Sequence, residues 1–263
     1  MAVSSPIAQL QVEVVHRHVA IVTLHRPQVR NAIDAALAEA IDGVVKQVEA
    51  DGDIRAVVLS SSQDRVFCAG ADLAEIAAGR GDRLMTADGG FAGFVQARRT
   101  KPWIAAVRGA AFAGGCELAL ACDMIVAHDA ALFSLPEVKL GVYAGAGGAY
   151  RLPARLPRNV AMELLLTGGA IDGGRAFALG MVNRLSAMDA VVDTAVELAR
   201  AITANGPIAV QESFAVARAA SDMLDAQIFP LSERARERVF ASADAQEGAR
   251  AFLEKRPPVW QGR

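Results

Sequence analysis

Strand-like and helix-like segments alternate through the first half of this sequence, and this alternation constrains the fold more than any other feature. Residues 9–25 hold two runs of β-branched residues around a His16-Arg17-His18 turn, a pattern typical of a β-hairpin. A helix is predicted next, with Asn31 and Asp34 as candidate N-terminal caps and Asp51-Gly52 as its end. Its apolar residues recur at helical spacing: Leu37, Ile41, Val44, Val45 and Val48. Short strands are then predicted at 55–60, 103–107 and 124–127, and helices at 72–78 and 117–122. This order predicts an α/β fold with largely parallel strands.

The second half of the chain has a different character, because helical patterns dominate beyond about residue 158. Helices are predicted at residues 159–166, 173–179, 190–203, 207–220, 231–241 and 245–254. No linker rich in Pro, Gly or Ser separates this part from the rest. We therefore expect residues 1–195 to form an α/β core that carries the active site. Residues 196–263 should form a helical C-terminal region that packs on this core or on a neighbouring subunit.

Composition excludes several classes of protein. The 263 residues are 53% hydrophobic with a formal net charge of −2, which suits a globular enzyme rather than a disordered chain or a nucleic-acid binder. No apolar run reaches about 18 residues, so no membrane span is predicted, and the first residues lack the pattern of a signal peptide. Cys68, Cys116 and Cys122 cannot all pair with one another, which favours buried thiols in the cytoplasm. No Cys/His cluster has metal-ligand spacing, so no metal is expected.

Two glycine-marked turns each precede a predicted helix, at Gly70-Ala71-Asp72 and at Gly114-Gly115. Glycine permits a close backbone approach, and a helix N-terminus presents N–H groups that have no partner within the helix. Two such N–H groups that converge on one point would bind a carbonyl oxygen and stabilise its negative charge. Two ordinary tight turns would give the same sequence pattern, so the glycines alone do not establish a site.

Two glutamates, Glu117 and Glu137, lie in strongly apolar surroundings. Glu117 is followed by Leu118-Ala119-Leu120-Ala121, and Glu137 follows Leu135-Pro136. Most carboxylates are solvated surface charges, but a buried carboxylate is costly unless it has a partner or a task. Burial and mutual repulsion would raise at least one pKa, leaving one acid and one base near neutral pH. Such a division suits the addition of water across a double bond.

These motifs together resemble the crotonase (enoyl-CoA hydratase/isomerase) superfamily over about residues 10–257. Phe67-Cys68-Ala69-Gly70-Ala71-Asp72-Leu73 is similar to the first signature of that family and Gly114-Gly115-Cys116-Glu117-Leu118-Ala119 to the second. Further similarity lies in Arg26-Pro27, Asn31-Ala32, Pro136-Glu137, Leu140-Gly141, Gly145-Ala146-Gly147-Gly148, Arg151-Leu152, Leu166-Thr167-Gly168, Gly180-Met181-Val182-Asn183 and Glu247-Gly248. The order and the spacing of these segments make a chance match improbable.

The resemblance implies a fold, a site and an assembly. The fold would be a spiral of ββα units with a helical C-terminal region that forms a homotrimer or a dimer of trimers. Glu117 and Glu137 would be catalytic, and the N–H groups of Ala71 and Gly114 would form the oxyanion hole. The remaining implied residues would contact the substrate or its coenzyme A portion: Arg26, Ala69, Asp72, Leu73, Phe240 and Lys255. No separate cofactor is implied, because coenzyme A is part of the acyl-CoA substrate.

Two segments differ from many enoyl-CoA hydratases. The loop Gly141-Val142-Tyr143-Ala144-Gly145 lacks a proline before its last glycine, and with Tyr150-Arg151-Leu152-Pro153 it is closer to the carnitinyl-CoA dehydratase-like branch. Ala74 stands where many members have a basic residue near the phosphates of coenzyme A. The segment 79–90, with four glycines, is expected to be a mobile loop, and the apolar residues Leu84, Met85, Phe91 and Phe94 are expected to wall the acyl pocket.

The leading hypothesis is an enoyl-CoA hydratase-type lyase. Isomerase, dehalogenase and thioesterase chemistry on the same fold are alternatives. Dinucleotide binding at Gly145–Gly148 is disfavoured, because Tyr150 replaces the last small residue of that fingerprint and Pro136 and Gly141 interrupt the preceding strand. RNA binding would use the clusters Arg151, Arg155 and Arg158 or Arg234, Arg236 and Arg238, but nearby acids offset these charges. We therefore expect no nucleic-acid partner and no membrane partner.

Overall fold

In the computed structural model, which describes residues 4–220 and 225–263, the chain begins with the predicted hairpin. Strand β1 (Leu10–Val15) pairs antiparallel with β2 (Val19–Leu24), and His16 and Arg17 take positive φ values in the turn between them. Helix α1 (Ala35–Ala50) follows, and the Asp34 carboxylate caps it by accepting a hydrogen bond from the N–H of Leu37 at 2.8 Å. The predicted hairpin and first helix are therefore confirmed.

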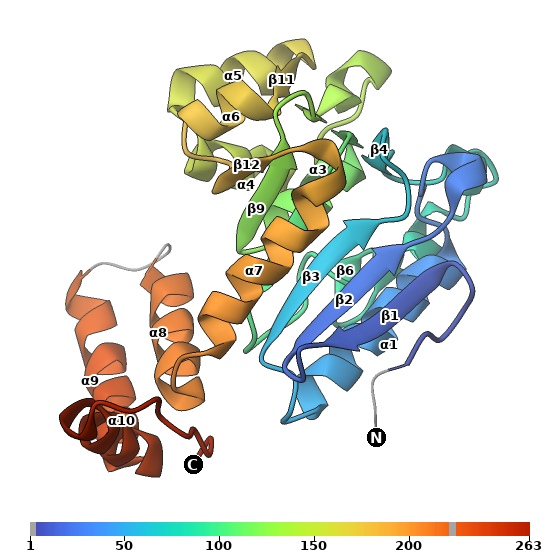
Figure 1. Ribbon diagram of the computed structural model, residues 1–263. Coiled ribbons are helices and arrows are strands. Elements are labelled where there is room, and N and C mark those ends of the chain that lie inside the picture. The colour runs from blue at the N-terminus through green and yellow to red at the C-terminus, as the bar shows by residue number, and fades with distance from the viewer. Residues whose placement is uncertain (1–3, 221–224) are drawn as a thin grey trace. The chain divides into compact units, whose positions relative to one another are not determined.

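The larger sheet is mainly parallel, as expected. In spatial order its strands are β1, β2, β3 (Ala56–Ser61), β7 (Trp103–Val107), β9 (Met124–His128) and β12 (Arg184–Ser186). All neighbours after the first hairpin pair in parallel. The apolar side of α1 packs on this sheet through buried residues that include Leu37, Ile41 and Val44, and Figure 1 shows α1 against the strands β1 to β3. Burial of this face fixes the helix to the sheet.

A smaller sheet places the ends of three strands side by side. Its order is β11 (Ala170–Asp172), β10 (Leu132–Ser134), β8 (Ala110–Phe112) and β4 (Val66–Cys68), and β4, β8 and β10 are mutually parallel. Each of these three strands comes directly after a strand of the larger sheet, in the pairs β3–β4, β7–β8 and β9–β10. A helical segment follows each pair: α2 (Leu73–Ala77), α3 (Gly114–Ala121) and the 3₁₀ helix η3 (Pro136–Leu140). The chain thus advances as repeated turns of strand, strand and helix.

The segment predicted to be a mobile loop, residues 79–90, contains regular structure. It includes the 3₁₀ helix η2 (Gly81–Leu84) and most of a small hairpin, β5 (Met85–Thr86) and β6 (Gly90–Phe91). The Thr86 hydroxyl donates to Asp42 at 2.9 Å and accepts from the N–H of Gly89 at 3.0 Å. These contacts tie the hairpin to α1, so the description of this segment as a loop was wrong.

The chain groups into two compact units, Met1–Ala199 and Arg200–Arg263, while the predicted boundary at residues 195/196 remains a prediction. The later elements of the first unit are α4 (Gly148–Arg155), α5 (Arg158–Thr167), α6 (Gly173–Ala178), the 3₁₀ helix η4 (Met188–Ala190) and most of α7 (Val191–Thr203). An early 3₁₀ turn, η1 (Pro27–Val29), completes this unit.

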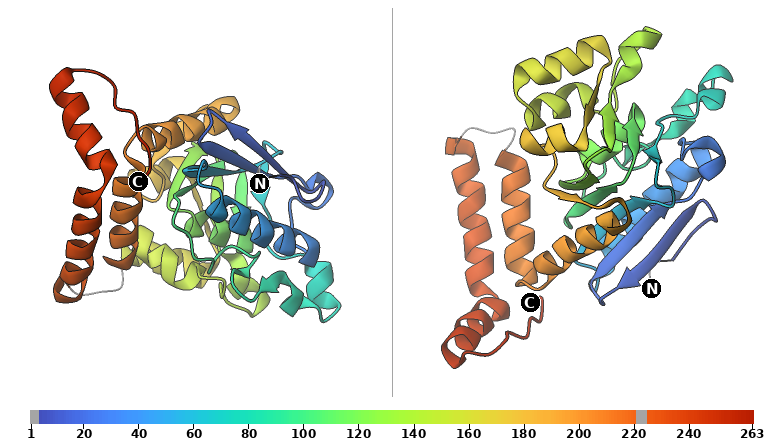
Figure 2. Two further views of the ribbon diagram at one scale, coloured as in Figure 1. Left: turned by 90° about the horizontal axis from the view of Figure 1, so that it is seen from below. Right: turned by 45° about the horizontal axis from the view of Figure 1, so that its top comes forward.

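The second unit is helical, as predicted. It contains the end of α7 and the helices α8 (Pro207–Ala220), α9 (Asp225–Ala241) and α10 (Ala243–Glu254). Both views of Figure 2 show α8 and α9 side by side. The buried carboxylate of Asp244 accepts hydrogen bonds from the N–H groups of Gln261 and Gly262, which fastens the chain after α10 back onto that helix. In the described residues, no helix is both long enough and apolar enough to cross a membrane.

Candidate active site

Three parallel strands of the smaller sheet deliver the candidate residues to one edge. Ala71 follows β4, Gly114 and Glu117 follow β8, and Glu137 follows β10. Because β4, β8 and β10 are parallel neighbours, their carboxyl ends meet at the same edge of the sheet. The N–H of Ala113 also donates to the carbonyl of Ser134 at 2.9 Å, which holds the end of β8 to the end of β10.

The two candidate oxyanion donors lie on adjacent turns that press against each other. Gly70 has a φ of +99°, and a Cβ there would lie 2.9 Å from the nitrogen of Gly114. A Cβ on Gly114 would in turn lie 2.5 Å from the ring of Phe91. Neither site has room for a side chain, so glycine is required for this close approach.

The backbone around Ala71 turns its N–H away from the neighbouring chain. In the bridge between Ala71 and Ile33, the N–H of Ile33 donates to Gly70 at 2.8 Å and the N–H of Asp72 donates to Ile33 at 2.9 Å. Successive N–H groups of an extended chain point to opposite sides, so the N–H of Ala71 faces away from Ile33. Gly114 is the first residue of α3, where helical N–H groups have no partner in the helix. The joint action of these two N–H groups on one oxygen atom remains a prediction.

Glu117 is buried in the first turn of α3 with an exposed fraction of 3%. Its Oε1 accepts a hydrogen bond from the N–H of Gly148 at 2.8 Å. Burial raises the pKa of the Glu117 carboxyl to about 7, and the charge of Glu137 acts in the same direction. Backbone hydrogen bonds from Gly148 and Ala146 and the charge of Arg151 act in the opposite direction. The carboxyl can therefore gain or lose a proton near neutral pH.

Glu137 lies in η3 and is partly buried. Burial raises the pKa of this carboxyl above its ordinary value. Its Oε2 atom is buried without a hydrogen-bond partner in the described chain, an arrangement that favours the protonated acid or a bound polar group. Glu117 and Glu137 are close enough to influence each other electrostatically, so one can hold a proton while the other is ionised.

Arg26 and Asp72 support the loop after β4. The Arg26 guanidinium lies 3.0 Å from a carboxylate oxygen of Asp34 and 3.0 Å from one of Asp72. Asp72 also caps α2 by accepting from the N–H of Ala74 at 3.0 Å. Both side chains are thus engaged within the protein and shape the turn that carries Ala71. Their expected contact with the substrate remains a prediction.

The other residues expected to contact substrate lie in different surroundings. Leu73 is 65% exposed at the start of α2, and Ala69 is partly buried before the Gly70 turn. Phe240 and Lys255 belong to the second unit, where both side chains are exposed. Among the residues expected to wall the acyl pocket, Phe91 lies against Gly114, whereas Phe94 is fully buried and packs edge-to-face on Trp103 at 4.9 Å. Phe94 therefore serves the core.

The three cysteines are buried free thiols. Burial raises the pKa of Cys68 to about 12 and the pKa of Cys116 still further. The Cys68 thiol donates to the carbonyl of Asn31 at 3.1 Å. A thiolate nucleophile is disfavoured at these positions near neutral pH, which supports the interpretation of both residues as packing groups.

The structure also bears on the alternatives. The glycine-rich segment 145–148 follows the 3₁₀ helix η3 rather than a strand, which disfavours dinucleotide binding. Three arginines of the clusters considered for RNA binding are engaged within the protein, which disfavours that alternative. Arg155 donates to the carbonyl of Cys122 at 2.8 Å, and Arg236 and Arg238 form ion pairs with Glu233 and Glu212, respectively. Within residues 4–220 and 225–263, no group of three or more His, Cys, Asp or Glu side chains is placed to hold a metal ion.

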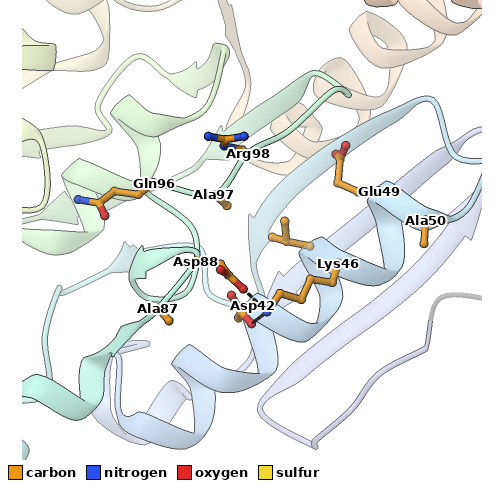
Figure 3. A pocket seen from close by; sticks show the side chains of 10 residues that line it. Asp42, Lys46, Glu49, Ala50, Ala87, Asp88, Gln96, Ala97 and Arg98 are labelled. Carbon is orange, nitrogen blue, oxygen red and sulfur yellow. Dashed lines mark ion pairs between the residues drawn. The ribbon is translucent and has the colours of Figure 1, made fainter.

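A cavity of about 770 Å³ lies elsewhere in the first unit, between α1 and residues 87–98 (Figure 3). Its lining includes Asp42, Lys46, Glu49, Asp88 and Arg98, and it contains none of the candidate catalytic residues. The Lys46 ammonium lies 2.8 Å from Asp42 and 2.8 Å from Asp88, so both carboxylates are already paired within the protein. The cavity gives no indication of a second reaction centre.

Sequence reasoning missed the backbone donor to Glu117. Gly148 lies 31 residues from Glu117 along the chain, and its N–H comes from the first residue of α4. The Gly145–Gly148 run contributes to the family resemblance, but the only function considered for it from the sequence was dinucleotide binding, which was disfavoured. The costly burial of Glu117 was the available signal, because a buried carboxylate requires a donor.

Comparison with known proteins identifies the family of this chain. Residues 15–263 match the family model described as enoyl-CoA hydratase/isomerase. The chain is 40% identical to the carnitinyl-CoA dehydratase of Citrobacter koseri over 253 residues, which cover 92% of this chain and 94% of that protein. It is also similar to the crystal structure of enoyl-CoA hydratase from Mycobacterium tuberculosis, with a TM-score of 0.92 and 40% identity over 97% of this chain and 99% of that chain.

A second solved structure is also similar to this chain over nearly its whole length. The chain matches the crystal structure of carnitinyl-CoA hydratase from Mycobacterium avium with a TM-score of 0.77 and 43% identity, over 97% of this chain and 99% of that chain. Together these similarities confirm the expected α/β spiral with C-terminal helices.

Proposed function

Since the chain belongs to the enoyl-CoA hydratase/isomerase family, we propose that it is an enoyl-CoA hydratase-type lyase. The proposed reaction adds water reversibly across the 2,3 double bond of an enoyl-CoA thioester and gives a 3-hydroxyacyl-CoA. The observation that carries this proposal is the pair Glu117 and Glu137. Both carboxyls have raised pKa values, and both follow strands of the smaller sheet whose parallel neighbours lead to Ala71 and Gly114, the proposed oxyanion donors.

The proposed chemistry divides the work between the two carboxyls. The ionised one accepts a proton from water while the water oxygen forms a bond to C3 of the enoyl group. The electron pair of the double bond moves to the thioester oxygen, and the N–H groups of Ala71 and Gly114 stabilise that enolate. The protonated carboxyl then donates its proton to C2. Atoms and charge balance without a metal or a separate cofactor, so coenzyme A enters only as part of the substrate.

Dehydration of a 3-hydroxyacyl-CoA is the second candidate, because it is the same reaction in reverse. It is favoured by the 40% identity to a protein named carnitinyl-CoA dehydratase. We also propose a homotrimer or a dimer of trimers in the cytoplasm. Phe240 and Lys255 would contact coenzyme A in that assembly.

A panel of CoA thioesters tests the activity. Purified protein should remove the conjugated enoyl absorbance of at least one trans-2-enoyl-CoA among short, long, branched and aromatic members, and carnitinyl-CoA tests the dehydration arm. The matched control is a protein with both Glu117→Gln and Glu137→Gln, in which this absorbance change should disappear. Absence of hydration or dehydration across the whole panel would refute the proposal.

A further inference from the structure

One arginine holds the loop that supplies the hydrogen bond to Glu117. Arg151, in α4, donates from Nη1 to the carbonyl of Ala146 at 3.0 Å and from Nη2 to the carbonyl of Val95 at 2.5 Å. Val95 is buried in the core, with an exposed fraction of 3%. The guanidinium therefore ties the residues before α4 to a fixed part of the protein.

The backbone beside this arginine is shaped to receive it. Gly147 has a φ of +113°, and a Cβ at that position would lie 1.9 Å from Nη1 of Arg151. The next residue is Gly148, whose N–H donates to Oε1 of Glu117 at 2.8 Å. The clamped carbonyl and the donating N–H are thus only two residues apart, and a shift of one would move the other.

We propose that Arg151 is a positioning residue for Glu117, acting by clamping the Ala146 and Val95 carbonyls so that the N–H of Gly148 is aimed at the carboxylate. The inference rests on the proposed hydratase function, because it gives Glu117 its proton-transfer role. Arg151 acts on Glu117 through the backbone and through its positive charge.

The charge and the clamp of Arg151 make different predictions. The charged groups that influence Glu117 are Glu137 from η3 and Arg151 from α4, and the Cys116 thiol adjoins it on α3. Glu137 raises the pKa of Glu117 and Arg151 lowers it, after the larger effect of burial. Lysine would keep the charge of Arg151 but cannot form the same two-pronged bond to two carbonyls. Glutamine would remove the charge and weaken the clamp.

The experiment compares Arg151→Gln and Arg151→Lys by the pH dependence of kcat/KM, which reports the free enzyme. In Arg151→Gln, the limb of the kcat/KM profile that lies nearest pH 7 should move to higher pH. The shift should be smaller than the change of about 1–3 pKa units that an arginine in direct contact with a carboxylate causes. In Arg151→Lys, this shift should be smaller. Both variants should lose at least about tenfold in kcat, because the Gly148 donor is misplaced.

Arg155→Gln is the matched control. Arg155 lies one turn later on α4 and also donates to a backbone carbonyl, that of Cys122 at 2.8 Å. Its loss should lower thermal stability without moving the pH limb. If Arg151→Gln folds, as judged by circular dichroism, and retains the wild-type limb and kcat, the positioning role is refuted. If Arg151→Gln does not fold, the kcat of Arg151→Lys is the test: a loss of at least about tenfold supports the positioning role, and a wild-type kcat refutes it.

A readout without turnover separates this inference from the proposed function. The infrared carbonyl band of protonated Glu117 can be assigned by its absence in Glu117→Gln and followed against pH. The midpoint of that titration should be higher in Arg151→Gln than in wild type. Lack of hydration by wild type would refute the proposed function alone, whereas an unchanged midpoint would refute the action of Arg151 on Glu117.

Discussion

Replacement of Glu117 by glutamine should change how the stability of the protein depends on pH. The side chain is almost fully buried, and burial raises the pKa of its carboxyl from the ordinary 4.5 to about 7. The folded state therefore holds this proton more tightly than the unfolded state does. The stabilising contribution is complete below about pH 4.5 and is lost as pH rises through about 7.

The magnitude follows from proton linkage. Each pKa unit corresponds to about 1.4 kcal/mol, so the ionised carboxyl lowers the free energy of unfolding by roughly 3 kcal/mol well above pH 7. Between pH 5 and pH 8, the same relation gives a change of about 2.5 kcal/mol. Glutamine has nearly the same shape, keeps an oxygen that can accept from Gly148, and does not titrate. Any effect of the substitution on the free energy of unfolding that does not depend on pH cancels when the two pH values are compared.

Urea unfolding of wild type and Glu117→Gln at pH 5 and pH 8, at one protein concentration, measures this difference. The free energy of unfolding of Glu117→Gln relative to wild type should be about 2.5 kcal/mol more favourable at pH 8 than at pH 5. Glu39→Gln, on the exposed side of α1, controls for the loss of one surface carboxylate. If the difference in free energy of unfolding between wild type and Glu117→Gln changes by less than about 0.5 kcal/mol from pH 5 to pH 8, Glu117 ionises as it does in water. The argument from burial would then fail.

Three further predictions concern activity and assembly. Glu117→Gln and Glu137→Gln should each keep affinity for a CoA thioester but lower kcat by about 10²–10⁴-fold, and the double variant should lose less than the product of the single losses; normal turnover in either single variant would remove that residue from the mechanism. A thioether analogue that lacks the thioester carbonyl should bind about five- to hundredfold more weakly than the matched thioester in calorimetry, because two hydrogen bonds from Ala71 and Gly114 are lost; equal affinities would contradict the oxyanion hole. Light scattering at micromolar concentration should give the mass of a trimer or of a pair of trimers, and a stable monomer would contradict the proposed assembly.

Local patterns were enough to predict the elements that carry their own signals. Helix α1 begins at the Asp34 cap and buries residues at helical spacing, and the first hairpin is formed by two runs of β-branched residues. Glu117 could be recognised as unusual because a charge within Leu118-Ala119-Leu120-Ala121 is costly to bury. The structure bears out that reasoning, since Glu117 is buried and its pKa is raised.

The strands of the smaller sheet were missed because β4, β8 and β10 have only three residues each, too few to show a period of two. Pairing between distant segments makes these strands, and their parallel alignment brings Ala71, Gly114, Glu117 and Glu137 to one edge.

Tertiary structure also decided what surrounds each candidate residue. The apolar run around Glu117 predicted a buried carboxylate. Only the fold brings the N–H of Gly148 to Glu117 from 31 residues away, and Arg151 holds the loop that carries Gly148. The fold likewise commits Arg26 to Asp34 and Asp72, and Phe94 to the core against Trp103. A residue's type and its immediate neighbours determine its propensity and the cost of burying it. Hydrogen bonds, ion pairs and electrostatic effects depend instead on distances through space, which the chain sets only when its remote segments pack together.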